Sequence, residues 1–175
     1  MGMPTTAIYF LLAVLATQPL IKLGVEPLAA HLFVLYFGLM SMITPPVALA
    51  AFTAAKLADA GPMGTALAAC QFGWPAFIVP FLFVLAPNLI MVGDTVDIAV
   101  AFFTAVVGIW FASAGFIGFL TRRLSPTLRA IYIIGGLGLL IPSEAFSEAY
   151  IIQVGGAGIC VLAFLLERRQ KDVVI

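Results

Sequence analysis

Long apolar runs separated by short polar interruptions dominate the pattern of residues along this chain. A helix needs about 20 apolar residues to cross the ~30 Å of hydrocarbon in a bilayer. Runs of that order recur along the sequence, and each predicts a helix that crosses the membrane or is embedded in it. They cover residues 4–21, 28–57, 74–91, 96–120, 127–141 and 148–166. The pattern therefore predicts an all-α integral membrane protein, a polytopic helical bundle.

The second run is too long for one straight span and is interrupted in its middle. Residues 41–46 read Ser-Met-Ile-Thr-Pro-Pro. Two consecutive prolines remove two N–H donors, and each disfavours helical geometry in the residue before it. We therefore predict a helix, an unwound stretch, and a second helix from about Val47 to Leu57.

The remaining segments refine this outline. Residues 58–72 tolerate polar groups and predict a short interfacial helix. The run over residues 74–91 contains prolines at positions 75, 80 and 87, which we expect to kink it. The last two runs are rich in small residues such as Gly135-Gly136 and Gly155-Gly156, a composition typical of closely packed membrane helices.

Composition agrees with a lipid environment. The chain is 63% hydrophobic and only 9% charged, and its mean hydropathy is +1.19, whereas soluble domains carry about 25% charged residues. A formal net charge of zero, without a basic stripe, argues against nucleic acid as a partner. No serine or cysteine has a histidine partner that the sequence can place, so an enzyme is the weakest hypothesis.

Basic residues predict the orientation. One cluster lies in a single loop and another follows the last run, and two predicted spans separate them, so both lie on the same face. Loops rich in Lys and Arg are usually cytoplasmic, which places the C-terminus in the cytoplasm. The first run then emerges on the outside near Lys22. It begins either at the cytoplasmic face or at mid-membrane, as the returning arm of a re-entrant hairpin. The two clusters are Arg122, Arg123 and Arg129, and Arg168, Arg169 and Lys171.

Two interrupted elements carry candidate chemistry. Irregular backbone at membrane depth persists only where protein or a water-filled cavity satisfies its polar groups, and secondary transporters use such breaks to hold Na⁺. Ser41 and Thr44 supply hydroxyls at the proline break, and residues 2–6 form a second polar stretch with two threonines. The alternative is that the prolines only kink the helix. The residues alone leave both possibilities open.

A pair of motifs resembles the large membrane subunit of TRAP transporters, the tripartite ATP-independent periplasmic systems, of the DctM-like permease type. The motifs are Gly-Met-Pro-Thr-Thr-Ala at residues 2–7 and Gly-Leu-Met-Ser-Met-Ile-Thr-Pro-Pro-Val-Ala-Leu at residues 38–49. Residues 24–33 are also typical of the fused-permease branch. The resemblance covers residues 1–92. Residues 93–175 resemble, less specifically, the membrane region of about three helices that is appended to some fused permeases.

The resemblance implies an elevator-type transporter built from two inverted repeats, each with a re-entrant hairpin and a broken helix. This chain would hold one half. Residues 2–6 would be the hairpin tip and residues 41–47 the break, and both would contribute to sodium sites that flank the substrate, an organic anion of carboxylate type. Sodium would be the coupling ion, with no other metal or cofactor. The residues implied in sodium or substrate binding are Gly2, Met3, Pro4, Thr5, Thr6, Gly38, Ser41, Ile43, Thr44, Pro45, Pro46 and Val47.

The sequence departs from that family in lacking the first repeat and the outer arm of the hairpin. We therefore expect a C-terminal fragment of a longer permease. The implied partners are a periplasmic solute-binding protein, the remaining N-terminal part of the permease, and the lipid of a bacterial inner (plasma) membrane. The competing hypothesis is a non-transporting membrane scaffold or accessory subunit, in which the break is only a kink and Thr44→Val is silent.

Four single residues complete the predictions. His31, the only histidine, is more easily explained by a solvated interfacial position than by proton relay or substrate contact. Gln153 is expected to hydrogen-bond another helix. Cys70 and Cys160 are expected to be buried free thiols rather than a disulfide.

Overall fold

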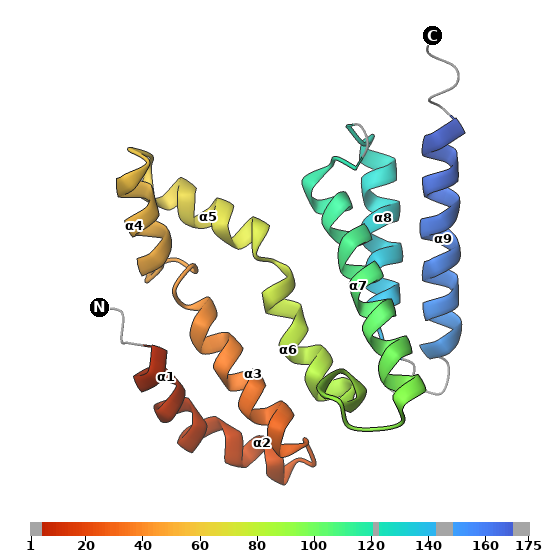
Figure 1. The fold of residues 1–175 in the computed structure, drawn as a ribbon. Helices are drawn as coiled ribbons and strands as arrows, with labels where there is room; N and C mark the ends of the chain where they lie inside the picture. Colours follow the sequence, from red (N-terminus) through yellow and green to blue (C-terminus); the bar gives the residue numbers. More distant parts are fainter. Residues whose placement is uncertain (1–4, 121–122, 143–148, 170–175) are drawn as a thin grey trace. The chain divides into compact units, whose positions relative to one another are not determined.

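The computed structural model describes residues 5–120, 123–142 and 149–169, and the elements in these residues are helices (Figure 1). The chain divides into two compact units, Met1–Ile90 and Met91–Ile175. Three helical segments of the described residues are long and apolar enough to cross a membrane: Thr5–Lys22, Pro62–Leu85 and Thr95–Ile117. The predicted all-α membrane fold is confirmed.

The first unit begins with one almost continuous apolar helix. It consists of α1 (Thr5–Leu12), a π-helical turn η1 (Ala13–Thr17) and α2 (Gln18–Lys22). Pro19 has no N–H to donate, and the wider π turn ends two residues before it. The chain then reverses through a turn in which Gly24 has a φ of +92°, a conformation that favours glycine.

The returning helix α3 (Pro27–Met40) packs antiparallel to this arm. Small residues allow a close approach: a Cβ added at Gly38 would lie 3.2 Å from the Cγ2 atom of Ile8. At the second contact the hydroxyl of Tyr9 and the Nδ1 atom of His31 are 2.9 Å apart. The arm and α3 therefore form a helical hairpin with both steric and polar contacts.

After the break come α4 (Leu49–Leu57), α5 (Pro62–Phe72), α6 (Pro75–Leu85) and a 3-10 turn η2 (Pro87–Ile90). Aromatic rings join α3 to α6, with Phe33 and Phe81 centroids 5.2 Å apart in an edge-to-face arrangement. The predicted interfacial helix and the following span form one 24-residue apolar segment, with a turn at Gly73 and Trp74.

The prediction of three proline kinks in residues 74–91 was wrong for two of the three prolines. Pro75 begins α6 and Pro87 follows its end, so these two prolines bound the helix. Pro75 sits where a missing N–H costs nothing because the first helical N–H groups have no intrahelical partner. Only Pro80 lies inside α6.

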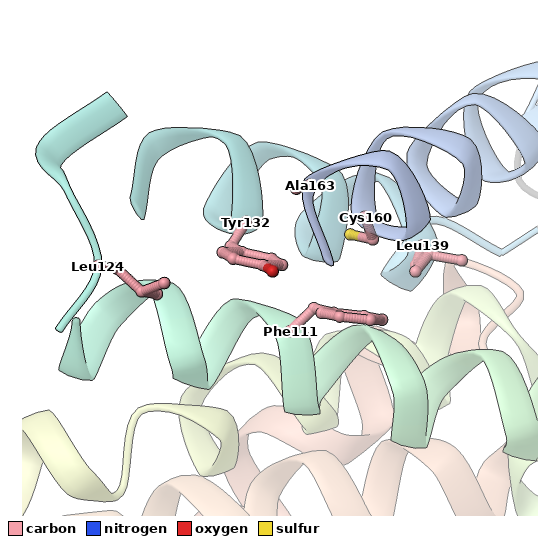
Figure 2. Close-up of a cluster of buried hydrophobic side chains, with 6 residues drawn as sticks. All are labelled: Phe111, Leu124, Tyr132, Leu139, Cys160 and Ala163. Carbon is pink, nitrogen blue, oxygen red and sulfur yellow. The ribbon is translucent and has the colours of Figure 1, made fainter. Parts of the chain in front are cut away.

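The second unit contains α7 (Thr95–Ile117), α8 (Pro126–Leu140) and α9 (Ala149–Arg169). Figure 2 shows the side chains at the centre of its core, where the rings of Phe111 and Tyr132 stack with centroids 5.6 Å apart. The cluster comprises Phe111, Leu124, Tyr132, Leu139, Cys160 and Ala163. Of the two predicted buried thiols, Cys160 is buried and Cys70 only half-buried, and both are free.

Glycines bring the three helices of this unit together. A Cβ at Gly136 of α8 would lie 2.5 Å from the backbone nitrogen of Ala112 in α7. A Cβ at Gly156 of α9 would lie 2.8 Å from the carbonyl oxygen of Gly135 in α8. The predicted close packing through small residues is confirmed at these positions, and Gly155 is an exception with nothing within 4 Å.

Polar side chains also join these helices. Gln153 Nε2 of α9 donates to the carbonyl oxygen of Leu139 in α8 at 3.5 Å, which confirms the predicted contact with another helix. Arg129 of α8 donates from Nε to Gly115 O at 3.1 Å and from Nη2 to Phe116 O at 3.0 Å, and so caps the end of α7. Of the two basic clusters, Arg122 and Lys171 lie outside the described residues.

Candidate functional site

The break between α3 and α4 is a compact series of turns. Helix α3 ends at Met40, the Pro45–Pro46 peptide bond is cis, and α4 begins at Leu49. The predicted interruption is confirmed, with the second helix starting two residues later than expected. The reason is Ala48, which is fully buried and has the left-handed backbone angles φ +36° and ψ +40°. An alanine in this region is strained because its Cβ crowds the following carbonyl oxygen.

Two hydroxyls of the break bind the last turn of α3. Ser41 Oγ donates to the carbonyl oxygen of Gly38, and Thr44 Oγ1 donates to that of Met40, each at 2.7 Å. A hydroxyl that donates its hydrogen keeps two lone pairs for another partner. Ser41 and Thr44 are both half-buried. Their oxygen atoms are therefore held in place while remaining able to act as ligands of a cation.

The carbonyl groups of the break are only partly paired. Met42 O accepts from Ala50 N at 3.0 Å and Thr44 O accepts from Ala48 N at 3.1 Å, so the polypeptide folds back on itself. Within the described part of the chain, the carbonyl oxygens of Ser41, Pro45 and Pro46 accept no hydrogen bond. Of the two carbonyls whose helical N–H partners would be Pro45 and Pro46, those of Ser41 and Met42, only Ser41 O is among the unpaired ones.

The N-terminal end of α1 lies at the same end of the hairpin as the break, as Figure 1 shows. Ile8 contacts Gly38, Thr5 precedes Ile8 by three residues, and Ser41 follows Gly38 by three. At 1.5 Å per helical residue, both ends extend about 4.5 Å beyond the contact in the same direction. Thr5 and Thr6 are thus brought towards the break, whereas the predicted site residues Gly2, Met3 and Pro4 lie outside the described residues.

Of the other predicted residues, Gly38 lies in the last turn of α3 and the rest lie on the break. Gly38 is buried against α1, Ile43 and Pro45 are half-buried, and Pro46 and Val47 are exposed. The residue types and the spacing of the motifs pointed to this stretch in the sequence. The hydrogen bonds that orient the hydroxyls of Ser41 and Thr44 are seen only in the structure.

Helix α5 also lines the break, which the sequence analysis missed. Ala66 packs with Ala48 and Ala51 in a buried cluster, and the Cys70 thiol donates to the carbonyl oxygen of Ile43 with an S···O distance of 3.4 Å. The available signal was the spacing of small residues at positions 66, 69, 70 and 73, one face of a helix.

His31 lies away from the break, in the second turn of α3. The hydroxyl of Tyr9, 2.9 Å from its Nδ1 atom, gives the ring a polar partner within the hairpin, and the interfacial position stays a prediction. The pair ties the arm to α3.

Comparison with known proteins identifies a family for this part of the chain. Residues 1–98 match the family model described as "Tripartite ATP-independent periplasmic transporter, DctM component". The match covers more than half of the 175 residues and includes the arm, the break, α5 and α6. No curated protein and no solved structure matches the chain.

Proposed function

Because the chain belongs to the DctM component family of tripartite ATP-independent periplasmic transporters, we propose that it helps to form a path by which an organic anion enters the cell together with sodium. The family is one of transporter permeases, so the chain is a permease component rather than an enzyme. The observation that carries the sodium-coupled part of the proposal is the opened backbone at residues 41–47 beside the start of α1.

Sodium is the coupling ion that suits this backbone. Broken helices of secondary transporters hold Na⁺ with backbone carbonyls freed by the break. Here the candidate ligands are the hydroxyl oxygens of Ser41 and Thr44 and the carbonyl oxygens of Ser41, Pro45 and Pro46. All are uncharged oxygen atoms, and two of them are anchored by hydrogen bonds to α3. The carbonyls have no partner in the described chain, and a bound cation would supply one.

An anionic substrate suits the neighbouring end of α1. The first N–H groups of a helix have no intrahelical partner and carry partial positive charge, so they favour a carboxylate. We propose that residues 2–6, with Thr5 and Thr6 at the start of α1, contact the substrate. In this arrangement the ion at the break and the anion at the helix end lie close enough to attract each other.

The partners and location follow from the same proposal. A periplasmic solute-binding protein would deliver the substrate, and the remaining N-terminal part of the permease would complete the site. The protein is a multi-pass membrane protein, and we place it in the inner membrane of a bacterial cell. The basic residues after α7 and α9 favour a cytoplasmic C-terminus.

Sodium-dependent uptake tests the proposal. The complete transport system is reconstituted in proteoliposomes with its solute-binding protein, and radiolabelled small carboxylates are screened with and without a sodium gradient. We expect Thr44→Val to raise the half-saturating sodium concentration about tenfold or more, because hydrogen-bonded groups that meet a charge contribute roughly 1.5–3 kcal/mol.

Thr53→Val is the matched control. Thr53 Oγ1 also donates to the carbonyl four residues before it, Leu49 O at 2.8 Å, but it lies inside α4 and is exposed. Its sodium dependence should match the wild type. A wild-type protein that transports without sodium, or a silent Thr44→Val, would refute sodium coupling at the break. Absence of any uptake would instead favour an accessory or scaffold role.

A further inference from the structure

Helix α5 holds one peptide group of the break from the side opposite α3. The carbonyl oxygen of Ile43 accepts from the Cys70 thiol at 3.4 Å. The N–H at the other end of the same peptide group, that of Thr44, donates to Met40 O at 3.0 Å. Both ends of the Ile43–Thr44 peptide are thus fixed, one by α5 and one by α3, and its plane cannot rotate without losing a hydrogen bond.

This peptide group determines where the Thr44 hydroxyl points. The hydroxyl donates to the same carbonyl, Met40 O, at 2.7 Å. A change in the ψ angle of Ile43 would displace both the carbonyl oxygen that Cys70 holds and the Cα atom of Thr44, and it would turn the lone pairs of the Thr44 hydroxyl away from their present direction. The Cys70 thiol therefore acts on Thr44 through the backbone, without being a ligand itself.

The face of α5 that contacts the break is built of small residues. Ala66 packs against Ala48 and Ala51, so α5 supports the strained left-handed residue as well as the peptide before Thr44. At the end of the helix, a Cβ added at Gly73 would lie 3.1 Å from the Cδ1 atom of Ile43. Helix α5 thus follows the broken backbone closely from Ala51 to Ile43.

We propose that Cys70 is a positioning residue for sodium binding: its thiol fixes the Ile43–Thr44 peptide and thereby the hydroxyl of Thr44. The inference rests on the proposed function, since it concerns the same site. It adds a residue from α5, outside both motifs that pointed to the site. The thiol forms no bond to ion or substrate, and its effect is on the geometry of the oxygen ligands.

Equilibrium binding of radioactive sodium to the purified complete permease tests the proposal without a known substrate. Cys70→Ala removes the donor and should raise the dissociation constant for sodium about threefold to tenfold, the range expected for one hydrogen bond. Cys70→Ser keeps a donor of similar size and should restore binding to within about twofold of the wild type. Cys160→Ala, which alters the thiol in the second unit, is the control and should leave the dissociation constant unchanged.

Gly64 in α5 and Gly73, the residue that follows its end, provide an independent pair of variants. Gly73→Ala places a methyl group against Ile43 and should also weaken sodium binding. Gly64→Ala lies inside α5 with nothing within 4 Å and should bind sodium like the wild type. Thermal unfolding of all variants is measured in parallel. A purely structural role would lower the melting temperature of Cys70→Ala and leave the sodium affinity of the folded protein intact.

The outcomes separate this inference from the proposed function. A wild-type protein without saturable sodium binding overturns both. Sodium binding by the wild type, with the same affinity in Cys70→Ala, overturns the inference alone. If Cys70→Ala fails to fold, alkylation of Cys70 by a maleimide in the Cys160→Ala background replaces it, with the modified peptide identified by mass spectrometry. Sodium should slow that alkylation relative to potassium, and an equal rate in the two salts overturns the inference.

Discussion

The two units of this chain differ in their helices: those of the first unit are interrupted, and those of the second are continuous and closely packed. Nine of the 11 prolines lie in Met1–Ile90, and in the described part of that unit most of them begin a helix or lie in the break. Ten of the 16 glycines lie in Met91–Ile175, where several, such as Gly136 and Gly156, allow close contacts between helices. In the first unit, three carbonyls of the break accept no hydrogen bond from the described residues, and two hydroxyls keep free lone pairs. In the second, Gln153 uses its amide to join two helices.

This difference separates a region suited to binding from one suited to packing. A site for an ion needs oxygen atoms that the fold holds in place and leaves unsatisfied, and the break supplies them. A packed bundle needs polar groups that are all hydrogen-bonded, because each unsatisfied group in hydrocarbon costs free energy. The family match covers all of the first unit and only the first residues of α7 in the second. The following substitutions test the comparison, in order of decreasing expected effect.

Gly136→Ala should cause the largest loss of stability. The added methyl would lie 2.5 Å from Ala112 N and 2.8 Å from Gly108 O, which are backbone atoms, so α7 and α8 must move apart. We expect the free energy of unfolding in detergent to fall by about 3 kcal/mol. Gly155→Ala in α9 meets nothing within 4 Å and is the control. Equal stability of the two variants would contradict the role of glycine in the second unit.

Glycine should have opposite effects at two neighbouring alanines of the first unit. Ala48→Gly relieves a left-handed backbone, whereas Ala51→Gly, in the regular part of α4, lowers helix stability. We expect Ala48→Gly to be more stable than Ala51→Gly by about 2 kcal/mol. Chemical denaturation of both variants measures the difference. Equal losses would mean that the left-handed geometry at the break carries no strain.

Thr17→Val should raise stability by about 1 kcal/mol. Thr17 is fully buried, and its Oγ1 atom has no hydrogen-bond partner in the described part of the chain. Other helical threonines, such as Thr53 and Thr104, donate to the carbonyl four residues earlier. Thr17 ends a π-helical turn, whose wider spacing differs from the α-helical spacing that brings a threonine hydroxyl to the carbonyl four residues earlier. Valine has a similar volume and no polar side-chain atom. Thr53→Val provides the reference, and a destabilised Thr17→Val would reveal a hidden partner for the hydroxyl.

Gln153→Leu should have the smallest effect of the four. The bond to Leu139 O is 3.5 Å long, and interhelical hydrogen bonds in membranes contribute about 0.6 kcal/mol on average. We expect a loss of that size in detergent unfolding. A loss as large as that of Gly136→Ala would show that polar contacts, rather than glycine packing, hold the second unit together.

Much of the fold could be predicted because its signals are local. The spans predicted at residues 96–120 and 127–141 correspond to Thr95–Ile117 and Pro126–Leu140. The error at the end of α7 has a visible cause: Gly118 takes a φ of +78° and terminates the helix, a usual role for glycine. The interruption before α4 was predictable from two adjacent prolines alone.

Parts of the candidate site could not be predicted because they depend on contacts between distant residues. Ser41 and Thr44 were identified by residue type, but their hydrogen bonds to α3 follow from the path of the turn. Cys70 lies 27 residues from Ile43, and no local pattern indicates that its thiol meets that carbonyl. The left-handed angle of Ala48 was equally hidden, since alanine seldom adopts it.

The sequence by itself determined that this protein is helical, lies in a membrane and has a broken helix at residues 41–47. Hydrophobic run length and the missing N–H of proline are properties of short segments, and they act wherever the segment lies. Only the tertiary structure decided that the start of α1 lies at the same end of the hairpin as Ser41 and that α5 holds Ile43. These relations arise when antiparallel helices pack, because packing selects among the many arrangements that the same local segments allow.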